Sequence, residues 1–270
     1  PISAVPVAAP SPVVPPAVVP PVTRVPAAPE EDPEPEPWAP ARSLRTDAEA
    51  FSEYSDQVSA IVGAPACDAM PTTAQLVNLR STEEILEWAR PDQPIVFHCT
   101  NSGYGKGGDN PVTENEPMMP LSLYGRTKVA AEDVVLRHPL GVSLRFATLY
   151  GPSPRMRLDL LVNHFVHLAC VSRSAMRVYE PHFRRCVLHV SDAAEAIGLA
   201  VENADTLGRR PWNVGAENVT KAELCRMIRA AVPGFRWADS AERDLDQRDY
   251  SVSSERFKAE SGWAPLERLE

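Results

Sequence analysis

The chain has 270 residues, of which 44% are hydrophobic and 23% are charged, so it can bury a core and is not a fibrous, wholly disordered or membrane-spanning protein. A net charge of −9 and the lack of a long apolar run argue against nucleic acid or a membrane as a partner. The five cysteines lie far apart without metal-ligand spacing, which predicts a reduced, cytoplasmic protein with no bound metal.

Composition changes sharply along the chain. Half of the 28 prolines lie before residue 41, whereas all 13 glycines lie at or after Gly63. Because proline fixes φ and removes a hydrogen-bond donor, residues 1–42 are expected to be a disordered, extended tail, and residues 43–270 the folded domain. Two functions remain open for this tail: a simple linker, or a segment that docks through PxxP spacings onto an aromatic groove.

Helices and strands are expected to alternate from residue 43 onward. The hydrophobic spacing predicts helices at 45–56, 76–89, 123–137, 158–169, 193–203 and 221–231. It predicts strands at 58–62, 94–99, 142–149, 186–190 and 211–214. Strands that alternate with helices of ten or more residues are typical of a mostly parallel sheet covered on both faces. The sequence therefore predicts an α/β fold with a doubly wound parallel sheet.

The run Tyr124-Gly-Arg-Thr-Lys128 carries the clearest chemical signal. Residues four apart share one face of a helix, so the ammonium of Lys128 is expected beside the phenol of Tyr124. A neighbouring cation favours the phenolate, which would make Tyr124 a general base with a lowered pKa. The alternative is a half-exposed aromatic residue and a solvated charge.

A hydroxyl residue, Thr100, follows the predicted strand PIVFHC. In an open parallel sheet, side chains just beyond the strand ends face the ligand crevice. Thr100 could therefore donate a hydrogen bond to the oxygen whose proton Tyr124 takes.

Several motifs occur in an order that resembles the extended short-chain dehydrogenases/reductases, in particular the NAD-dependent epimerase/dehydratase family of nucleotide-sugar enzymes. The resemblance is carried by DQVSAIVGA (56–64), NLRST (78–82), CTNSGYG (99–105), YGRTK (124–128), LRFATLYGP (144–152), RCVLHVSD (185–192), WNVG (212–215) and SGWAP (261–265). It implies a Rossmann-like sheet with a small C-terminal substrate-binding lobe, mainly 152–190 and 215–270.

The resemblance also implies roles for individual residues. Tyr124 would be the general acid/base, Lys128 would lower its pKa and hold the cofactor ribose, and Thr100 would bind the reacting sugar oxygen. Asn78 would contact the cofactor, NAD or NADP. Hydride would pass between the nicotinamide and a sugar carbon, usually C4.

Substrate contacts are implied as well, and a homodimer is one assembly that the resemblance allows. Arg185 would bind the diphosphate of a nucleotide sugar, or alternatively form a surface ion pair. The other implied substrate contacts are Asn163, Arg155, Arg157 and Thr148. For Arg155 and Arg157 a solvated loop is the alternative, and Thr148 stands where the family commonly has Asn.

The sequence lacks the family's glycine-rich turn, since no glycine precedes Gly63. The sheet is therefore expected to be incomplete, as in a truncated or frame-shifted gene product. A non-catalytic binding protein without a pyrophosphate site is the alternative to an enzyme.

The residues after Thr100 bear on the type of reaction. The family's dehydratases carry an Asp-Glu pair there, and its decarboxylases carry Glu at the second position. This chain has Asn101 and Ser102, so the resemblance implies a 4-epimerase or a 4-ketoreductase.

Overall fold

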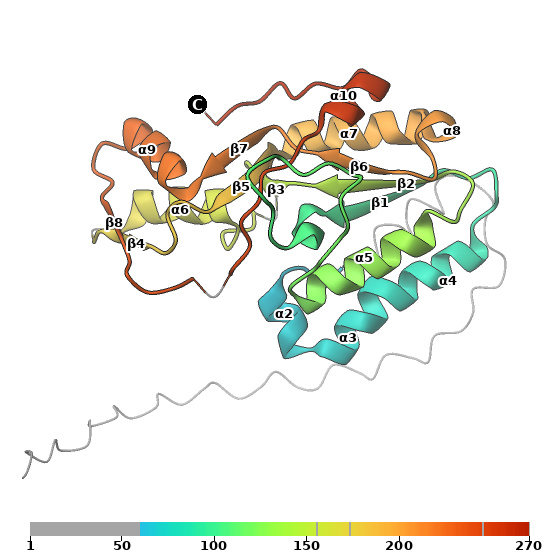
Figure 1. Ribbon diagram of the computed structural model, residues 1–270, viewed down its shortest axis with the longest axis horizontal. Coiled ribbons are helices and arrows are strands. Elements are labelled where there is room, and N and C mark those ends of the chain that lie inside the picture. Colours follow the sequence, from blue (N-terminus) through green and yellow to red (C-terminus); the bar gives the residue numbers. More distant parts are fainter. Residues whose placement is uncertain (1–59, 155, 173, 245, 270) are drawn as a thin grey trace, which may run out of the picture. The chain divides into compact units, whose positions relative to one another are not determined.

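The structure, a computed structural model, describes residues 60–154, 156–172, 174–244 and 246–269 (Figure 1). The expected tail, the helix at 45–56 and the first residues of the strand at 58–62 lie outside the described residues. Its helical segments are α2 (Ala64–Ala69), α3 (Pro71–Gln75), the π-helix Leu76–Arg80, α4 (Ser81–Trp88), the 3-10 helix Asn101–Tyr104, α5 (Leu123–Val135), α6 (Leu161–Val171), α7 (Val190–Glu202), α8 (Ala204–Leu207), α9 (Lys221–Ala231) and α10 (Glu255–Ser261). Its strands are β1 (Ile95–Thr100), β2 (Gly141–Phe146), β3 (Thr148–Tyr150), β4 (Met176–Val178), β5 (Arg184–His189), β6 (Pro211–Val214), β7 (Glu217–Thr220) and β8 (Trp237–Asp239).

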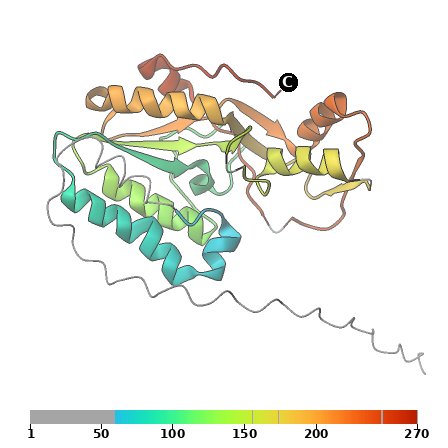
Figure 2. The ribbon, with the colours of Figure 1, turned by 180° about the vertical axis from the view of Figure 1, so that it is seen from behind.

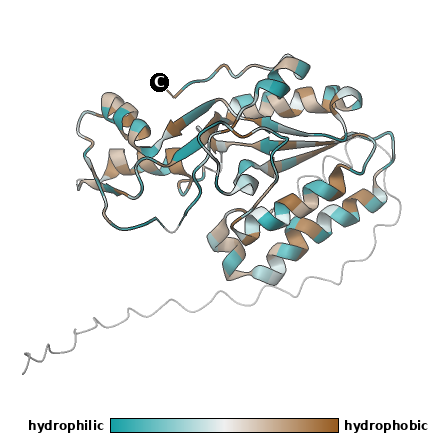
Figure 3. Ribbon diagram, in the orientation of Figure 1, coloured by the Kyte–Doolittle hydropathy of each residue, from teal (hydrophilic) through white to brown (hydrophobic). Residues whose placement is uncertain are grey.

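The central sheet has the order β1-β2-β6, and both of its strand pairings are parallel. Helices α4 and α5 cover one face and α7 covers the other, as both ribbon views show (Figures 1 and 2). A parallel sheet covered on both sides needs strands that are buried throughout, and every residue of β2 is buried. In Figure 3, α4 and α5 carry hydrophobic and hydrophilic residues in alternating bands, as expected for helices with one face on a sheet. The expected α/β class with a parallel, Rossmann-like sheet is thus confirmed.

The prediction of a single strand at 142–149 is wrong, because the structure divides this segment between two sheets. The amide of Ala147 donates to the carbonyl of Val214 at 2.9 Å, which is the last bond to β6. The chain then continues as β3, which pairs in parallel with β5. The second sheet has the order β3-β5-β7, in which β7 is antiparallel to β5. No glycine, proline or other break in residues 142–149 marks the point at which the chain changes partner.

A second, smaller core lies among α6, α9, β4 and β8. Met176 and Val178 of β4 belong to this core, Trp237 of β8 packs against it, and its largest aromatic members are Phe165 and Phe235. The first core lies around the central sheet and is centred on Trp212, Phe257 and Trp263. The residues of the second core come mainly from the segments in which the substrate-binding lobe is expected.

The described part of the predicted strand at 58–62 is not a strand. Instead, the side chain of Asn78 bonds the backbone of Ile61, with Ile61 N donating to Oδ1 at 2.8 Å and Nδ2 donating to Ile61 O at 3.0 Å. Helix α2 begins directly afterwards, at Ala64. The side-chain amide of Asn78 takes the place that a neighbouring strand would have, so residues 60–62 are held without joining the sheet.

None of the helices within the described ranges is long and apolar enough to span a membrane.

Candidate functional site

Thr100 is the last residue of β1 and is buried. Its hydroxyl oxygen accepts a hydrogen bond from the amide of Ser102 at 3.1 Å, which starts the 3-10 helix that follows. Because the oxygen accepts in this bond, the hydroxyl hydrogen stays free to donate to a ligand. Between these two residues, Asn101 is only 1% exposed, and neither its side-chain nitrogen nor its side-chain oxygen has a hydrogen-bond partner.

Tyr124 and Lys128 lie one turn apart near the start of α5, which Ser122 caps by accepting a hydrogen bond from Gly125 N at 3.1 Å. Lys128 is 6% exposed, and its Nζ lies 3.9 Å from the centroid of the Phe97 ring. Burial lowers the pKa of Lys128 to about 8. No residue in the described ranges accepts a hydrogen bond from this ammonium, and the ring of Phe97 is its cation–π partner.

Tyr124 does not have the lowered pKa that the spacing predicts. Its side chain is half-buried, and burial raises the pKa of Tyr124 to about 12, with smaller contributions of the same sign from Cys99 and Cys67. The cations that oppose this rise are Arg157 and Arg248. Desolvation outweighs their effect. In the structure, the hydroxyl of Tyr124 is therefore a proton donor rather than a phenolate.

Asn78, the expected cofactor contact, already uses both ends of its amide. Besides the two bonds to Ile61, its Nδ2 donates to Thr127 Oγ1 at 3.2 Å. Asn78 thus links residues 60–62 to the middle of α5 and holds the turn that carries Lys128. The structure gives it a role in positioning the helix.

The expected substrate contacts on the loop after β3 have different surroundings. Asn163 accepts a hydrogen bond from Gly151 N at 3.2 Å and donates one to Arg157 O at 3.1 Å, so its amide fastens the two ends of that loop. Arg157 forms two bonds with Asp159, at 2.6 and 2.7 Å. Thr148 is half-buried in β3, next to Val187 of β5. Arg155 lies outside the described residues.

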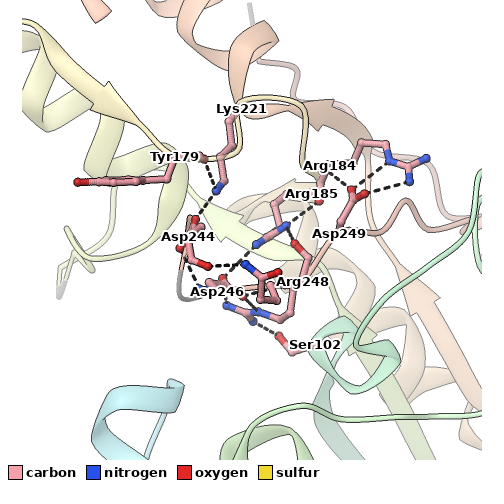
Figure 4. A network of polar contacts seen from close by, with 10 residues as sticks. Ser102, Tyr179, Arg184, Arg185, Lys221, Asp244, Asp246, Arg248 and Asp249 are labelled. Carbon is pink, nitrogen blue, oxygen red and sulfur yellow. Dashed lines mark hydrogen bonds and ion pairs between the residues drawn. The ribbon is translucent and has the colours of Figure 1, made fainter. Parts of the chain in front are cut away.

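Arg185 lies in a cluster of charged residues near the C-terminal segment (Figure 4). Its side chain is 6% exposed and donates to Asp246 Oδ2 at 3.0 Å, to Arg184 O at 2.9 Å and to the carbonyl of Arg248. The structure thus places Arg185 in an ion pair, as the alternative held, but a partly buried one, since the side chain of Asp246 is 37% exposed. Burial alone would raise the pKa of Asp246, but its bonds with Arg248 and the charge of Arg185 hold that pKa well below its usual range.

The sequence interpretation missed Arg248. Its Nη1 donates to Ser102 Oγ at 2.6 Å, across 146 residues of chain, and its other nitrogens bond both oxygens of Asp246 (Figure 4). This contact joins the C-terminal segment to the turn after Thr100. The alternation of Arg and Asp in RDLDQRDY (243–250) was the available signal, since closely spaced opposite charges indicate an ion-pair network.

The described residues contain no group of three or more His, Cys, Asp or Glu side chains that could hold a metal ion. The polar groups that surround the end of β1 and the start of α5 are hydroxyls, guanidiniums, an amide and an ammonium. Such a set can bind an oxygen-rich, anionic ligand and exchange a proton with it.

Comparison with protein families gives a match over residues 45–215 to the NAD dependent epimerase/dehydratase family. An uncharacterized UDP-glucose epimerase of Bacillus subtilis is 27% identical over 158 residues, which are 56% of this chain and 49% of the relative. Methionine adenosyltransferase 2 subunit beta of Rattus norvegicus is 26% identical over 60% of this chain and 49% of its own length. UDP-glucuronate 4-epimerase 6 of Arabidopsis thaliana is 39% identical over 85 residues, or 29% of this chain and 18% of the relative. The chain thus spans about half, or less, of these relatives.

Solved structures share the fold. The UDP-glucuronic acid 4-epimerase of Bacillus cereus, in complex with UDP-glucuronic acid and NAD, superimposes with a TM-score of 0.67 at 20% identity, over 78% of this chain and 70% of that one. MoeE5 in complex with UDP-glucuronic acid and NAD gives a TM-score of 0.65 at 24% identity, over 78% and 73% of the two chains.

Proposed function

Because the chain belongs to the NAD-dependent epimerase/dehydratase family, we propose that it carries the sugar-binding and proton-transfer machinery of a nucleotide-sugar 4-epimerase or 4-ketoreductase. The observation that carries the proposal is the buried ammonium of Lys128, which lies one helical turn from Tyr124 and has no acceptor among the described residues. A buried charge without a partner is costly, so a ligand with hydroxyl groups is the natural acceptor.

In this proposal Tyr124 exchanges a proton with the 4-hydroxyl of the sugar, and Thr100 donates a hydrogen bond to the same oxygen. The free hydroxyl hydrogen of Thr100 supports this role. The raised pKa of Tyr124 suits the step in which a ketone is reduced and the phenol gives up its proton. For the reverse step the site must lower that pKa, and the nearby cations Arg157 and Arg248 favour this direction.

NAD or NADP would lie against Lys128 and Tyr124, where the unpartnered ammonium fits the hydroxyls of a ribose. When bound, the cofactor would supply an acceptor for the hydride of the sugar carbon and the donor that returns it. Residues 1–62 contain no glycine, so this part of the chain does not itself supply a glycine-rich pyrophosphate-binding turn.

A second candidate is a binding protein of the same family without catalysis. It is supported by the similarity of this chain to a protein that is named as a subunit of another enzyme, methionine adenosyltransferase 2. The two candidates differ in whether NAD or NADP binds.

A cytoplasmic location and a homodimeric assembly belong to the same proposal. All five cysteines are free, which supports a reducing compartment. Sedimentation of the purified chain would test the dimer.

Titration calorimetry of the chain with NADH, NADPH and UDP-glucose tests the proposal. If the chain is an enzyme, UDP-glucose and one of the two dinucleotides should bind, and Lys128→Met should weaken the binding of that dinucleotide by at least about tenfold. Lys258→Met is the matched control, since Lys258 pairs with Glu255 on α10 at 2.9 Å, away from the site. Binding of UDP-glucose without either dinucleotide would support the second candidate. No binding of UDP-glucose at millimolar concentration would contradict both.

A further inference from the structure

Arg248 has hydrogen-bonding capacity that the protein does not use. A guanidinium carries five N–H groups. Those of Arg248 bond Asp246 at 2.6 and 2.7 Å and Ser102 at 2.6 Å, and the remaining two have no recorded acceptor among the described residues. The side chain is 31% exposed, so a ligand can reach it.

The charges around Arg248 do not balance. Asp249 pairs with Arg184, and Asp244 pairs with Lys221. Asp246, in contrast, is shared by Arg185 and Arg248, which both bond its Oδ2 (Figure 4). The cluster therefore keeps one positive charge without a counterion on the side that faces Ser102.

This charge lies beside Ser102, close in the chain to the residue that we assign to the reacting sugar oxygen. Ser102 lies two residues after Thr100, to which we assign the oxygen on C4 of the sugar. Asn101 stands between them, buried and with both polar atoms of its amide unpartnered. In a hexose, C6 is bonded to C5, the neighbour of C4, so a substituent on C6 lies close to the group that binds the C4 oxygen.

We propose that the substrate is a nucleotide uronate, whose C6 carboxylate is bound by Arg248 beside Ser102. This inference rests on the proposed function and names the class of its substrate. A carboxylate neutralises the excess charge and forms charge-assisted hydrogen bonds, which are about twice as strong as neutral ones. A neutral hydroxymethyl group leaves the charge uncompensated.

Titration of the full chain with UDP-glucuronate and with UDP-glucose tests the inference, because the two ligands differ only at C6. UDP-glucuronate is expected to bind at least about tenfold more tightly. Arg248→Met should bring the ratio of the two Kd values close to one, and Arg248→Lys should preserve part of it. Arg210→Met is the matched control, because Arg210 also pairs with a carboxylate, Glu260 at 2.8 Å, but directly precedes β6, at the end of that strand away from Val214. It should leave the ratio unchanged.

Three outcomes would overturn the inference. Equal affinity for the two sugars would overturn it while the proposed function stands. An Arg248→Met variant that binds both nucleotide sugars more weakly, with an unchanged ratio of their Kd values, would assign Arg248 to the diphosphate instead. Failure of both nucleotide sugars to bind would overturn the inference together with the proposed function. Melting of each variant, compared with the parent, separates loss of binding from loss of folding.

Discussion

The ammonium of Lys128 lies 3.9 Å from the centroid of the Phe97 ring, which joins α5 to β1. Sequence spacing predicts a different neighbour, Tyr124, one turn earlier on the same helix. Phe97 contributes a negative ring face, but it accepts no proton and offers no counterion. The contact therefore stabilises Lys128 only in part, and its pKa falls to about 8.

This lowered pKa makes the stability of the protein depend on pH. Unfolding returns Lys128 to its ordinary pKa near 10.5, so the unfolded chain binds the proton more tightly than the folded one. Below pH 8 the folded protein bears the cost of a buried charge, which amounts to roughly 3 kcal/mol for this shift. Stability should rise as the pH increases from about 8 toward 10.5.

Lys128→Met should therefore be more stable than the parent at pH 7, and the difference should shrink above pH 8. Urea denaturation of both proteins over this pH range measures it. Lys258→Met, a change at a half-buried lysine that is paired with Glu255, should show no such trend. A constant difference between Lys128→Met and the parent at every pH would contradict the assignment.

The second prediction concerns proton transfer. Tyr124→Phe keeps the ring and removes the hydroxyl, so conversion of a nucleotide sugar at C4 should fall by about 10² to 10⁴-fold. Tyr179→Phe is the control, since Tyr179 takes part in the charged cluster through its backbone carbonyl, which accepts from Lys221 at 2.9 Å. NMR of the sugar C4 proton measures the rate. An unchanged rate in Tyr124→Phe would remove this residue from the mechanism.

Local signals in the sequence predicted several elements well. Helix α9 begins at Lys221 as expected, because Thr220 and Glu223 form a capping box that needs only four neighbouring residues. Strand β6 likewise has the expected bounds, 211–214. The motif order was also sufficient to identify the family, which the family match confirms.

Contacts between distant residues could not be predicted. Asn78 replaces a neighbouring strand by bonding Ile61, and Arg248 reaches Ser102 across 146 residues. In both cases a polar side chain supplies a bond that hydrophobic periodicity does not encode. The separation of β2 from β3 could not be predicted either, because the strand with which each of them pairs lies elsewhere in the chain.

The third prediction concerns a buried ion pair beneath the site. Glu132 is 1% exposed and bonds Arg145 at 2.6 Å, and it also accepts from Ser143 Oγ at 2.6 Å. Glu132→Gln leaves the buried guanidinium without a counterion, so the free energy of unfolding should fall by about 3–5 kcal/mol. Glu83→Gln, which breaks an exposed pair with Arg80, should change it by less than about 1 kcal/mol. Equal effects of the two variants in urea denaturation would contradict the prediction.

The fourth prediction concerns the loop after β3. Asn163→Ala removes the acceptor for Gly151 N and the donor to Arg157 O, so the loop should open more often. Amide exchange at Gly151 should accelerate by about tenfold, which corresponds to the loss of one net hydrogen bond. Asn203→Ala is the control, because Asn203 directly follows α7 and donates to Leu199 O of that helix at 2.8 Å, away from this loop. Unchanged exchange at Gly151 in Asn163→Ala would show that the loop is held by other contacts.

The last prediction concerns the product. Elimination of water needs an acid and a base beside the sugar, and the residues after Thr100 are an amide and a hydroxyl, neither of which cycles a proton at neutral pH. Loss of carbon dioxide from a uronate is disfavoured for another reason: a carboxylate paired with Arg248 is stabilised as an anion, and that pairing is lost when the carboxylate leaves. The remaining chemistry is hydride and proton transfer at C4. Mass spectrometry of the product should therefore show a nucleotide sugar that has lost neither water nor carbon dioxide: equal in mass to the substrate after epimerisation, or two hydrogens heavier after reduction of a 4-keto sugar. A 4-keto-6-deoxy product or a nucleotide pentose would contradict the roles assigned to Asn101, Ser102 and Arg248.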